Sequence, residues 1–367
     1  MRLVGEGTAR PAAAHLPALT GLRFLLAVWV ILHHLTGHRQ ALEPLALAMP
    51  AAVYTLIRGG YLAVTTFFVL SGFVLAHGYA ATQWNGRSLL RYGTARFARI
   101  YPVYALSLLV VAPFIAADRV PAKARLVAEH GLLIQGWFGR LPVGWNTPAW
   151  TLSCEMFFYA MFPLAALFLR RPNWWSTALL AVAACCLTRI LWRAGVSDDT
   201  KPLIHMADFL MGIAAARAYG LLLGAGRRLT GAWLYLPAAV FAAALIAHPG
   251  ALPRSVDLNS ALRPLNAVLL IGLAFGGGAA ARALSSPAAV YLGKASYAMY
   301  ILHVPLLWWY LRWSHGFSSA IYLAGVIAIS AAVYTLVEEP ANRRLRAWCT
   351  TRTATRRALS ARPLAAC

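Results

Sequence analysis

The chain has 367 residues, of which 60% are hydrophobic and only 12% are charged. Soluble domains contain about 45–50% apolar and about 25% charged residues, so this composition excludes an ordinary soluble domain and indicates an integral membrane protein. The net charge of +22 would suit nucleic-acid binding, but the Lys and Arg residues lie mostly between apolar runs, so membrane topology explains them better and we expect no nucleic-acid partner.

Ten apolar runs in the chain are long enough to cross a hydrocarbon core of about 30 Å as helices. In chain order they lie near residues 20–36, 60–80, 100–117, 149–169, 174–194, 203–220, 231–248, 262–279, 297–313 and 320–337. A weaker run at 124–138 has Glu129 and His130 in its middle, so we expect a re-entrant or interfacial helix there. The pattern predicts an all-α polytopic membrane protein with about ten transmembrane helices. We predict one membrane domain over residues 1–345 and a basic, disordered cytoplasmic tail over 346–367.

The distribution of basic residues predicts the orientation of the helices. With ten spans and a cytoplasmic N-terminus, 19 Lys and Arg residues lie in inside segments, 8 in outside loops and 6 within spans. Cytoplasmic loops carry the excess of Lys and Arg in membrane proteins. We therefore expect both termini to be cytoplasmic.

The first apolar run carries three ionisable side chains, Arg23, His33 and His34. Such a side chain costs about 2.5–3.5 kcal/mol in the bilayer, so its retention indicates a partner or a function. Arg23 and His34 are eleven residues apart, which places them within about 20° of one helix face and roughly 16 Å apart along the axis. His33 points about 80° away from this face, and we interpret it as a packing residue.

Glu155 is the acidic residue that we expect to act with His34. It lies six residues into a span that enters from the outside, about 9 Å below the outer surface, and His34 has a similar depth in its own helix. A buried carboxylate and an imidazole at matched depth suit general acid–base catalysis. The alternative is a structural polar pair that joins two helices.

Two further stretches carry candidate binding residues. Arg91, Arg96 and Arg99 lie at the cytoplasmic entry of the third run, where they could hold a polyanionic ligand such as a nucleotide diphosphate or, alternatively, lipid phosphates. Ser71 and Gly72 lie in the middle of the second run, where small residues indicate close helix packing or a substrate passage.

His303 precedes Pro305 by two residues, near the start of the ninth run. A proline removes a backbone hydrogen bond, so we expect a local break that exposes polar groups there. An interhelical hydrogen bond of His303 is the alternative to a catalytic role.

Five stretches of the chain together resemble acyltransferase family 3, the integral-membrane O-acyltransferases of bacteria. In the family's order they read LTGLRFLLAVWVILHHL (19–35), FFVLSGFVL (67–75), RFARIYPVY (96–104), WTLSCEMFFYAMFP (150–163) and SYAMYILHVPL (296–306). A weaker sixth stretch is PLIHMADFLMGIAAA (202–216). Each stretch alone is a weak signal of the family. The resemblance is specific because all of them occur together and in the family's order.

The resemblance assigns roles to residues of this chain. Arg23 and His34 match the family's Arg-x10-His pair, Glu155 its acidic residue after Trp-x-Leu-Ser, and Arg96 with Arg99 its Arg-x-x-Arg pair. His34 and Glu155 are then the expected catalytic residues. The residues expected to bind acyl-coenzyme A or the acceptor are Arg23, Arg96, Arg99, Tyr104, Ser71, Trp150 and His303. We expect no metal, because the five cysteines show no metal-ligand spacing.

The implied activity is transfer of an acyl group, most often acetyl, from acyl-coenzyme A in the cytoplasm to a hydroxyl of a cell-envelope carbohydrate. The implied location is the bacterial cytoplasmic (inner) membrane. Thr20 stands where the family often has aspartate, so an acid paired with Arg23 is not expected. Many members add an esterase-like domain after the last span; this sequence resembles the standalone form, and a periplasmic partner enzyme would be encoded separately.

Two alternatives to this function remain open at the level of the sequence. The acceptor could be a secreted small molecule such as a macrolide. A protein of another class, a proton-coupled transporter, could use the buried His34 and Glu155 to carry protons, but it would not need the Arg96 and Arg99 pair.

Overall fold

The chain is described by a computed structural model. The residues that it describes are 16–37, 49–117, 123–138, 145–168, 172–196, 202–226, 230–248, 255–314, 316 and 318–348. These residues form helices, turns and short connections, with no strand among them. Most of the predicted tail, 349–367, lies outside the described residues.

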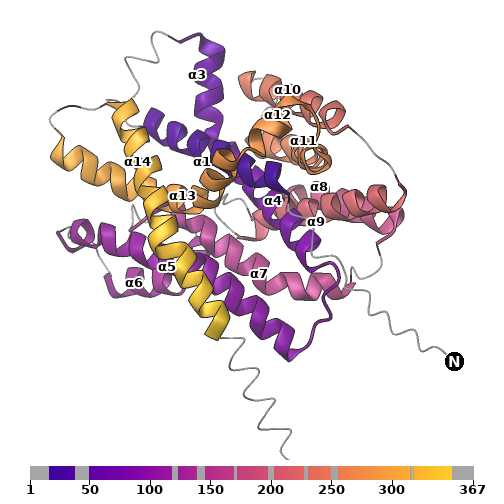
Figure 1. Cartoon of the computed structure of the whole chain (residues 1–367), viewed down its shortest axis with the longest axis horizontal. Coiled ribbons are helices and arrows are strands. Elements are labelled where there is room, and N and C mark those ends of the chain that lie inside the picture. Colours follow the sequence, from indigo (N-terminus) through magenta and orange to yellow (C-terminus); the bar gives the residue numbers. More distant parts are fainter. Residues whose placement is uncertain are drawn as a thin grey trace, which may run out of the picture.

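The helices follow the predicted runs in chain order (Figure 1). They are α1 (Pro17–Gly37), α3 (Ala51–Arg58), α4 (Ala63–Tyr79), α5 (Gly86–Ala117), α6 (Lys123–Gly131), α7 (Trp150–Phe168), α8 (Trp174–Arg193), α9 (Pro202–Gly224), α10 (Ala232–Ala247), α11 (Ser255–Phe275), α12 (Gly278–Leu284), α13 (Pro287–Trp313) and α14 (Ser319–Val333). A π-helical turn, Tyr334–Glu338, follows α14 directly, and the helix then continues to residue 348.

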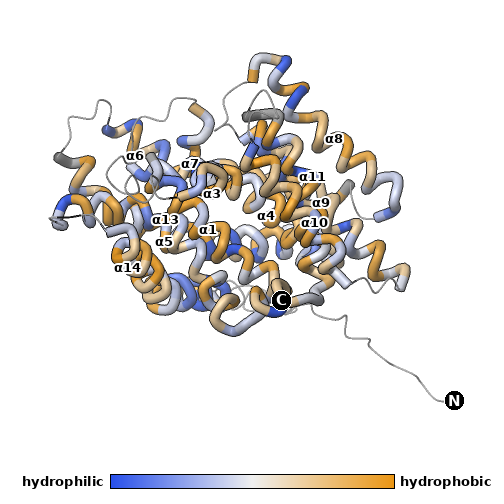
Figure 2. Tube along the Cα trace, turned by 90° about the horizontal axis from the view of Figure 1, so that it is seen from above, coloured by the Kyte–Doolittle hydropathy of each residue, from blue (hydrophilic) through white to orange (hydrophobic). Residues whose placement is uncertain are grey.

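Among the described residues, eight helical segments are long and apolar enough to cross a membrane. Figure 2 shows hydrophobic residues along most helices. Two predicted spans fall short of those criteria: α10 is apolar but has 16 residues, and the 27-residue α13 contains many Tyr and Trp residues. The prediction of an all-α polytopic membrane protein is confirmed, and the orientation of its termini stays a prediction. The weak run forms only the nine-residue α6 and a short 3-10 turn.

The centre of the fold is built from helix pairs that pack along their lengths, namely α4 with α9 and α1 with α13 (Figure 1). At Gly72 of α4, an added Cβ would lie 2.1 Å from the carbonyl oxygen of Phe209 on α9. At Gly212 of α9, it would lie 1.9 Å from the carbonyl oxygen of Val69. The two glycines therefore let the backbones touch, which confirms the packing role predicted for Gly72.

Replacing Gly72 with alanine should destabilise the protein, because its methyl group would meet a backbone atom that cannot move alone. We expect a loss of about 1–3 kcal/mol in the free energy of unfolding. The matched control is Gly78→Ala on the same helix, where an added Cβ would meet nothing within 4 Å. Thermal unfolding of both variants in the same detergent checks this, and equal midpoints would contradict it.

Pro305 does not break α13, although it removes a backbone donor from the helix. The carbonyl group that loses its partner is that of Ile301, and it accepts a hydrogen bond from Nδ2 of Asn146 at 2.8 Å instead. The carbonyl oxygen of His303 accepts a second one, from the Tyr322 hydroxyl at 2.6 Å. The break predicted at Pro305 is thus a change of hydrogen-bond partners within a continuous helix.

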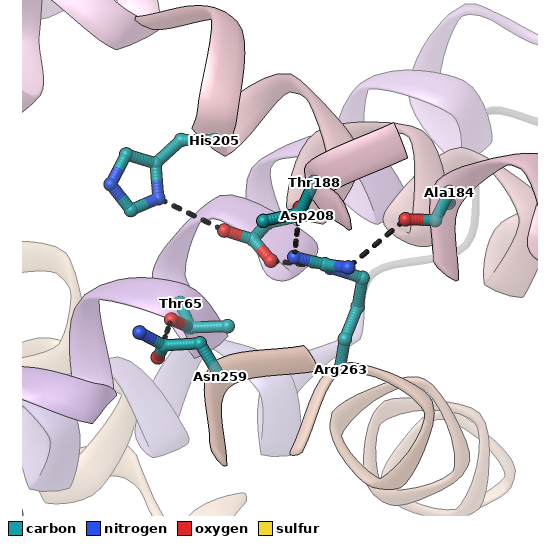
Figure 3. A network of polar contacts seen from close by, with 7 residues as sticks. All are labelled: Thr65, Ala184, Thr188, His205, Asp208, Asn259 and Arg263. Carbon is teal, nitrogen blue, oxygen red and sulfur yellow. Dashed lines mark hydrogen bonds and ion pairs between the residues drawn. The ribbon is translucent and has the colours of Figure 1, made fainter. Parts of the chain in front are cut away.

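A buried polar network holds α8, α9 and α11 together (Figure 3). Asp208 of α9 contacts Nδ1 of His205 at 3.0 Å and accepts a hydrogen bond from Nε of Arg263 at 2.7 Å. The Arg263 guanidinium also donates to the Thr188 hydroxyl at 2.9 Å and the Ala184 carbonyl at 3.0 Å, both on α8. Arg263 is 1% exposed, so its charge is balanced by Asp208 inside the bundle. We interpret this network as structural.

Candidate functional site

The two histidines His34 and His303 meet between α1 and α13. Their ring centroids are 4.8 Å apart, and Nε2 of His303 lies 3.3 Å from Nδ1 of His34. His303 is completely buried. The structure therefore realises the interhelical contact that was the alternative for His303, and the partner in that contact is His34.

The hydrogen bonds of this pair define which nitrogen of His34 can accept a proton. A carbonyl oxygen only accepts hydrogen bonds, so Nδ1 of His303, 2.7 Å from the Tyr300 carbonyl, carries a hydrogen. By the same argument, Nδ1 of His34 carries a hydrogen, because it lies 2.9 Å from the Val30 carbonyl. The His34 Nδ1–H is then shared between two acceptors, the Val30 carbonyl and Nε2 of neutral His303. Nε2 of neutral His34 is consequently its basic nitrogen.

Arg23, at the other end of α1, lines three cavities that follow one another. The inner cavity is narrow: it measures about 420 Å³ with its opening, but only about 50 Å³ of it is accessible to a water molecule, and its lining includes Arg23, Glu155 and Tyr300. The central cavity, about 940 Å³ with its opening, shares Arg23 and Glu155 with it. A third cavity, about 820 Å³ with its opening, shares Arg23 and Arg99 with the central one; we call it the basic mouth. Tyr300, which lines the inner cavity, also packs against the His303 ring.

Arg96 and Arg99 both line the central cavity, and aromatic rings hold their guanidinium groups. Arg96 lies 5.6 Å from the centroid of the Tyr159 ring, and Arg99 lies 5.6 Å from that of Tyr297. Arg99 also forms an ion pair with Glu338 of the π-helical turn. Nε of Arg96 is buried without a hydrogen-bond partner among the described residues. An unpaired buried donor beside a cavity suits a ligand acceptor such as a phosphate oxygen.

Glu155 lies in the inner and central cavities with Arg23. Its Oε2 accepts a hydrogen bond from the Tyr159 hydroxyl at 2.9 Å. The sequence suggested that Glu155 acts with His34; the structure places His303 against His34, and joint action of Glu155 and His34 stays a prediction. Glu155 also shares the lining of both cavities with Arg23, so it faces whatever occupies them.

Of three other predicted binding residues, Ser71 lies in the central cavity, whereas Tyr104 and Trp150 pack against neighbouring helices. Ser71 lines the central cavity. The Tyr104 hydroxyl donates to the His130 carbonyl of α6 at 2.9 Å, and the Trp150 ring packs on Phe68. Tyr104 and Trp150 thus support neighbouring elements. Burial lowers the pKa of His130, which favours its neutral form beside Tyr104.

The sequence reasoning missed several residues that line the cavities. They are Tyr159, Tyr297, Lys294, Glu338, Asn342, Arg343 and Arg346. The available signal for Glu338 was an acidic residue at the inner end of an apolar run, because the tenth predicted span stopped at residue 337. Among the described residues, no group of three or more His, Cys, Asp or Glu side chains could hold a metal ion.

A sequence profile of the acyltransferase domain of acyltransferase family 3 matches residues 16–338. The chain belongs to this family. The match includes α1 through α14, so it contains both the histidine pair and Arg23. The protein is a membrane acyltransferase, and the transporter alternative is set aside.

Curated relatives agree with this membership. The acyltransferase MdmB of Streptomyces mycarofaciens is 29% identical, over 91% of this chain and 94% of the relative. The O-acetyltransferase OatA of Staphylococcus aureus is 24% identical, over 42% of this chain and 25% of the relative. No solved structure matches the chain.

Proposed function

We propose that the protein transfers an acyl group, acetyl in the simplest case, from acyl-coenzyme A to a hydroxyl of a cell-envelope carbohydrate. The observation that carries the proposal is the arrangement along α1: a basic histidine nitrogen near one end and a cavity lined by arginines at the other. The name of OatA, an O-acetyltransferase, supports oxygen as the accepting atom and acetyl as the group. The basic mouth then faces the cytoplasm and the enzyme resides in the bacterial cytoplasmic membrane, in agreement with the excess of basic residues on that side.

The donor fits the chain of cavities by charge and by length. Arginine forks bind phosphate oxygens in pairs, so Arg96 and Arg99 hold the diphosphate of coenzyme A. The pantetheine arm points past Arg23 towards the narrow inner cavity, whose lining includes Tyr300. Arg23 and His34 are roughly 16 Å apart along α1, a distance that suits this extended arm. Tyr300, at this end of the arm, packs against His303 of the histidine pair.

The transfer step follows from the tautomer of His34. Nε2 of His34 removes the proton of the acceptor hydroxyl as its oxygen attacks the thioester carbonyl. The carbon–sulfur bond breaks, the sulfur leaves as the coenzyme A thiolate, and the proton on the His34 imidazolium passes to it. His303 holds the imidazole in the required tautomer and orientation. Glu155 positions Arg23 and balances its charge in the cavity.

Mass spectrometry of envelope glycans and secreted metabolites tests this function, in cells with and without the protein. We expect one esterified compound that is found only in cells with the protein. In the simplest case it is heavier than its unmodified form by one acetyl group. An ester on an envelope sugar supports a carbohydrate as the acceptor. An ester on a secreted compound shows instead that the acceptor is a small molecule. If no ester depends on the protein in either fraction, the proposed function is wrong.

A further inference from the structure

We propose that Lys294, Arg343 and Arg346 form a second anion subsite in the basic mouth, which binds a phosphomonoester on the donor separate from its diphosphate. The inference rests on the proposed function, because it concerns the donor that enters the same cavities. It deepens that function by assigning residues to the second phosphate of the donor, a nucleotide with two separate phosphate groups. Coenzyme A has this pattern, with a diphosphate on one side of its ribose and a phosphomonoester on another.

The first argument is the charge of the mouth. Its lining contains five basic side chains, Arg23, Arg99, Lys294, Arg343 and Arg346, and two acidic ones, Glu338 and Glu339. Glu338 pairs with Arg99, and Glu339 lies 3.7 Å from Arg343 in an exposed contact that contributes little. The mouth therefore keeps a surplus of positive charge beyond what its own acids balance. A cavity with such a surplus attracts and holds anions.

The second argument is the position of this charge. The diphosphate is assigned to the central cavity, with Arg96 and Arg99. Lys294 and Arg343 line the basic mouth and are not among the residues of the central cavity. Arg346 lines both. A donor held by its diphosphate would thus meet a further basic cluster outside it, from α13 and the helix that follows the π-helical turn.

The third argument is a pair of acceptors near the junction of the two cavities. Oε2 of Glu338 and Oδ1 of Asn342 are buried without a hydrogen-bond partner among the described residues. Glu338 lines the mouth, and Asn342 lines both cavities. Buried acceptors require a donor group, and the ribose hydroxyl or the adenine amino group of a nucleotide can supply it. The residues between the two basic clusters therefore fit a nucleoside that carries phosphate on both sides.

This assignment separates coenzyme A from related acyl carriers. Dephospho-coenzyme A lacks the phosphomonoester, so it would leave the second subsite empty. The phosphopantetheine arm of a carrier protein lacks the nucleoside as well, so it would leave Glu338 and Asn342 without a ligand donor. A subsite of this kind therefore favours acyl-coenzyme A over both of these carriers.

Binding of acetyl-coenzyme A and acetyl-dephospho-coenzyme A to the purified full chain in detergent, at one fixed ionic strength, tests the inference. Hydrogen bonds between charged groups are among the stronger polar contacts, so acetyl-coenzyme A should bind at least about tenfold tighter than acetyl-dephospho-coenzyme A. The triple variant K294Q/R343Q/R346Q should bind acetyl-coenzyme A about as weakly as the wild type binds the dephospho form. Its affinity for the dephospho form should fall much less, because only Arg346 of the three also lines the cavity assigned to the diphosphate. Arg344→Gln, on the same helix but outside the lining of the mouth, is the matched control and should keep the wild-type preference.

The outcomes distinguish the inference from the proposed function. Equal affinity of the wild type for the two ligands would overturn the subsite and leave the donor assignment intact. A triple variant that loses affinity equally for both ligands would also overturn it, since the charges would then act on the whole anion. Absence of binding of either ligand to a monodisperse wild-type protein would overturn the donor assignment itself.

Discussion

Replacing His34 with alanine should reduce the rate of acyl transfer by about 10²–10⁴-fold, because a hydroxyl is a poor nucleophile without a positioned base. The variant should still insert and fold, since the replacement removes polar rather than apolar groups from the bundle. Ester formation by membranes that contain equal amounts of wild type and variant provides the measurement. Near-normal transfer by His34→Ala would remove His34 from the mechanism.

The neighbouring His33 is the control for this experiment. Its Nδ1 lies 2.6 Å from the Arg58 carbonyl, and its ring contacts Tyr61 and the edge of the His34 ring, but no hydrogen bond to His303 is described for it. His33→Ala should therefore retain transfer within a few-fold of the wild type. A loss equal to that of His34→Ala would indicate that the two histidines act through the packing of α1.

Replacing His303 with leucine should lower the turnover number by about 10- to 100-fold, because His34 would lose the acceptor that fixes its tautomer. His303→Gln keeps an acceptor at this position and should retain more activity than His303→Leu. Affinity for acyl-coenzyme A should be the same in both variants, since His303 lies beyond the inner cavity. Turnover number and donor affinity are measured separately on protein of matched thermal stability.

A purely structural role of His303 predicts a different pattern. In that case leucine, which fills a buried apolar site at least as well as glutamine, would be the better replacement. Equal activity of the two variants, or higher activity of His303→Leu, would therefore contradict the positioning role.

The helices and the face shared by Arg23 and His34 could be predicted because they depend on local properties of the chain. Apolar runs of sufficient length predict spans, and helical periodicity relates residues within one helix. The same reasoning separated His33 from His34, and the structure gives the two histidines different partners.

The partner of His34 could not be predicted in this way. Counting residues from the ends of two spans gives their depths, but not which helices are neighbours or how they are rotated. Depth therefore suggested Glu155, whereas α13 brings His303, 269 residues further along the chain, against α1. Glu338 was missed for a related reason: the π-helical turn Tyr334–Glu338 carries the helix past the predicted end of the last span, where Glu338 meets Arg99.

The central claim is that His34 activates a hydroxyl that attacks an acyl thioester. The direct measurement is the release of free coenzyme A thiol alongside the formation of ester, in membrane vesicles supplied with acetyl-coenzyme A and acceptor. The wild type should release one thiol for each ester formed, and His34→Ala should form neither above background. Ester formation without thiol release, or equal rates in the wild type and His34→Ala, would contradict the claim.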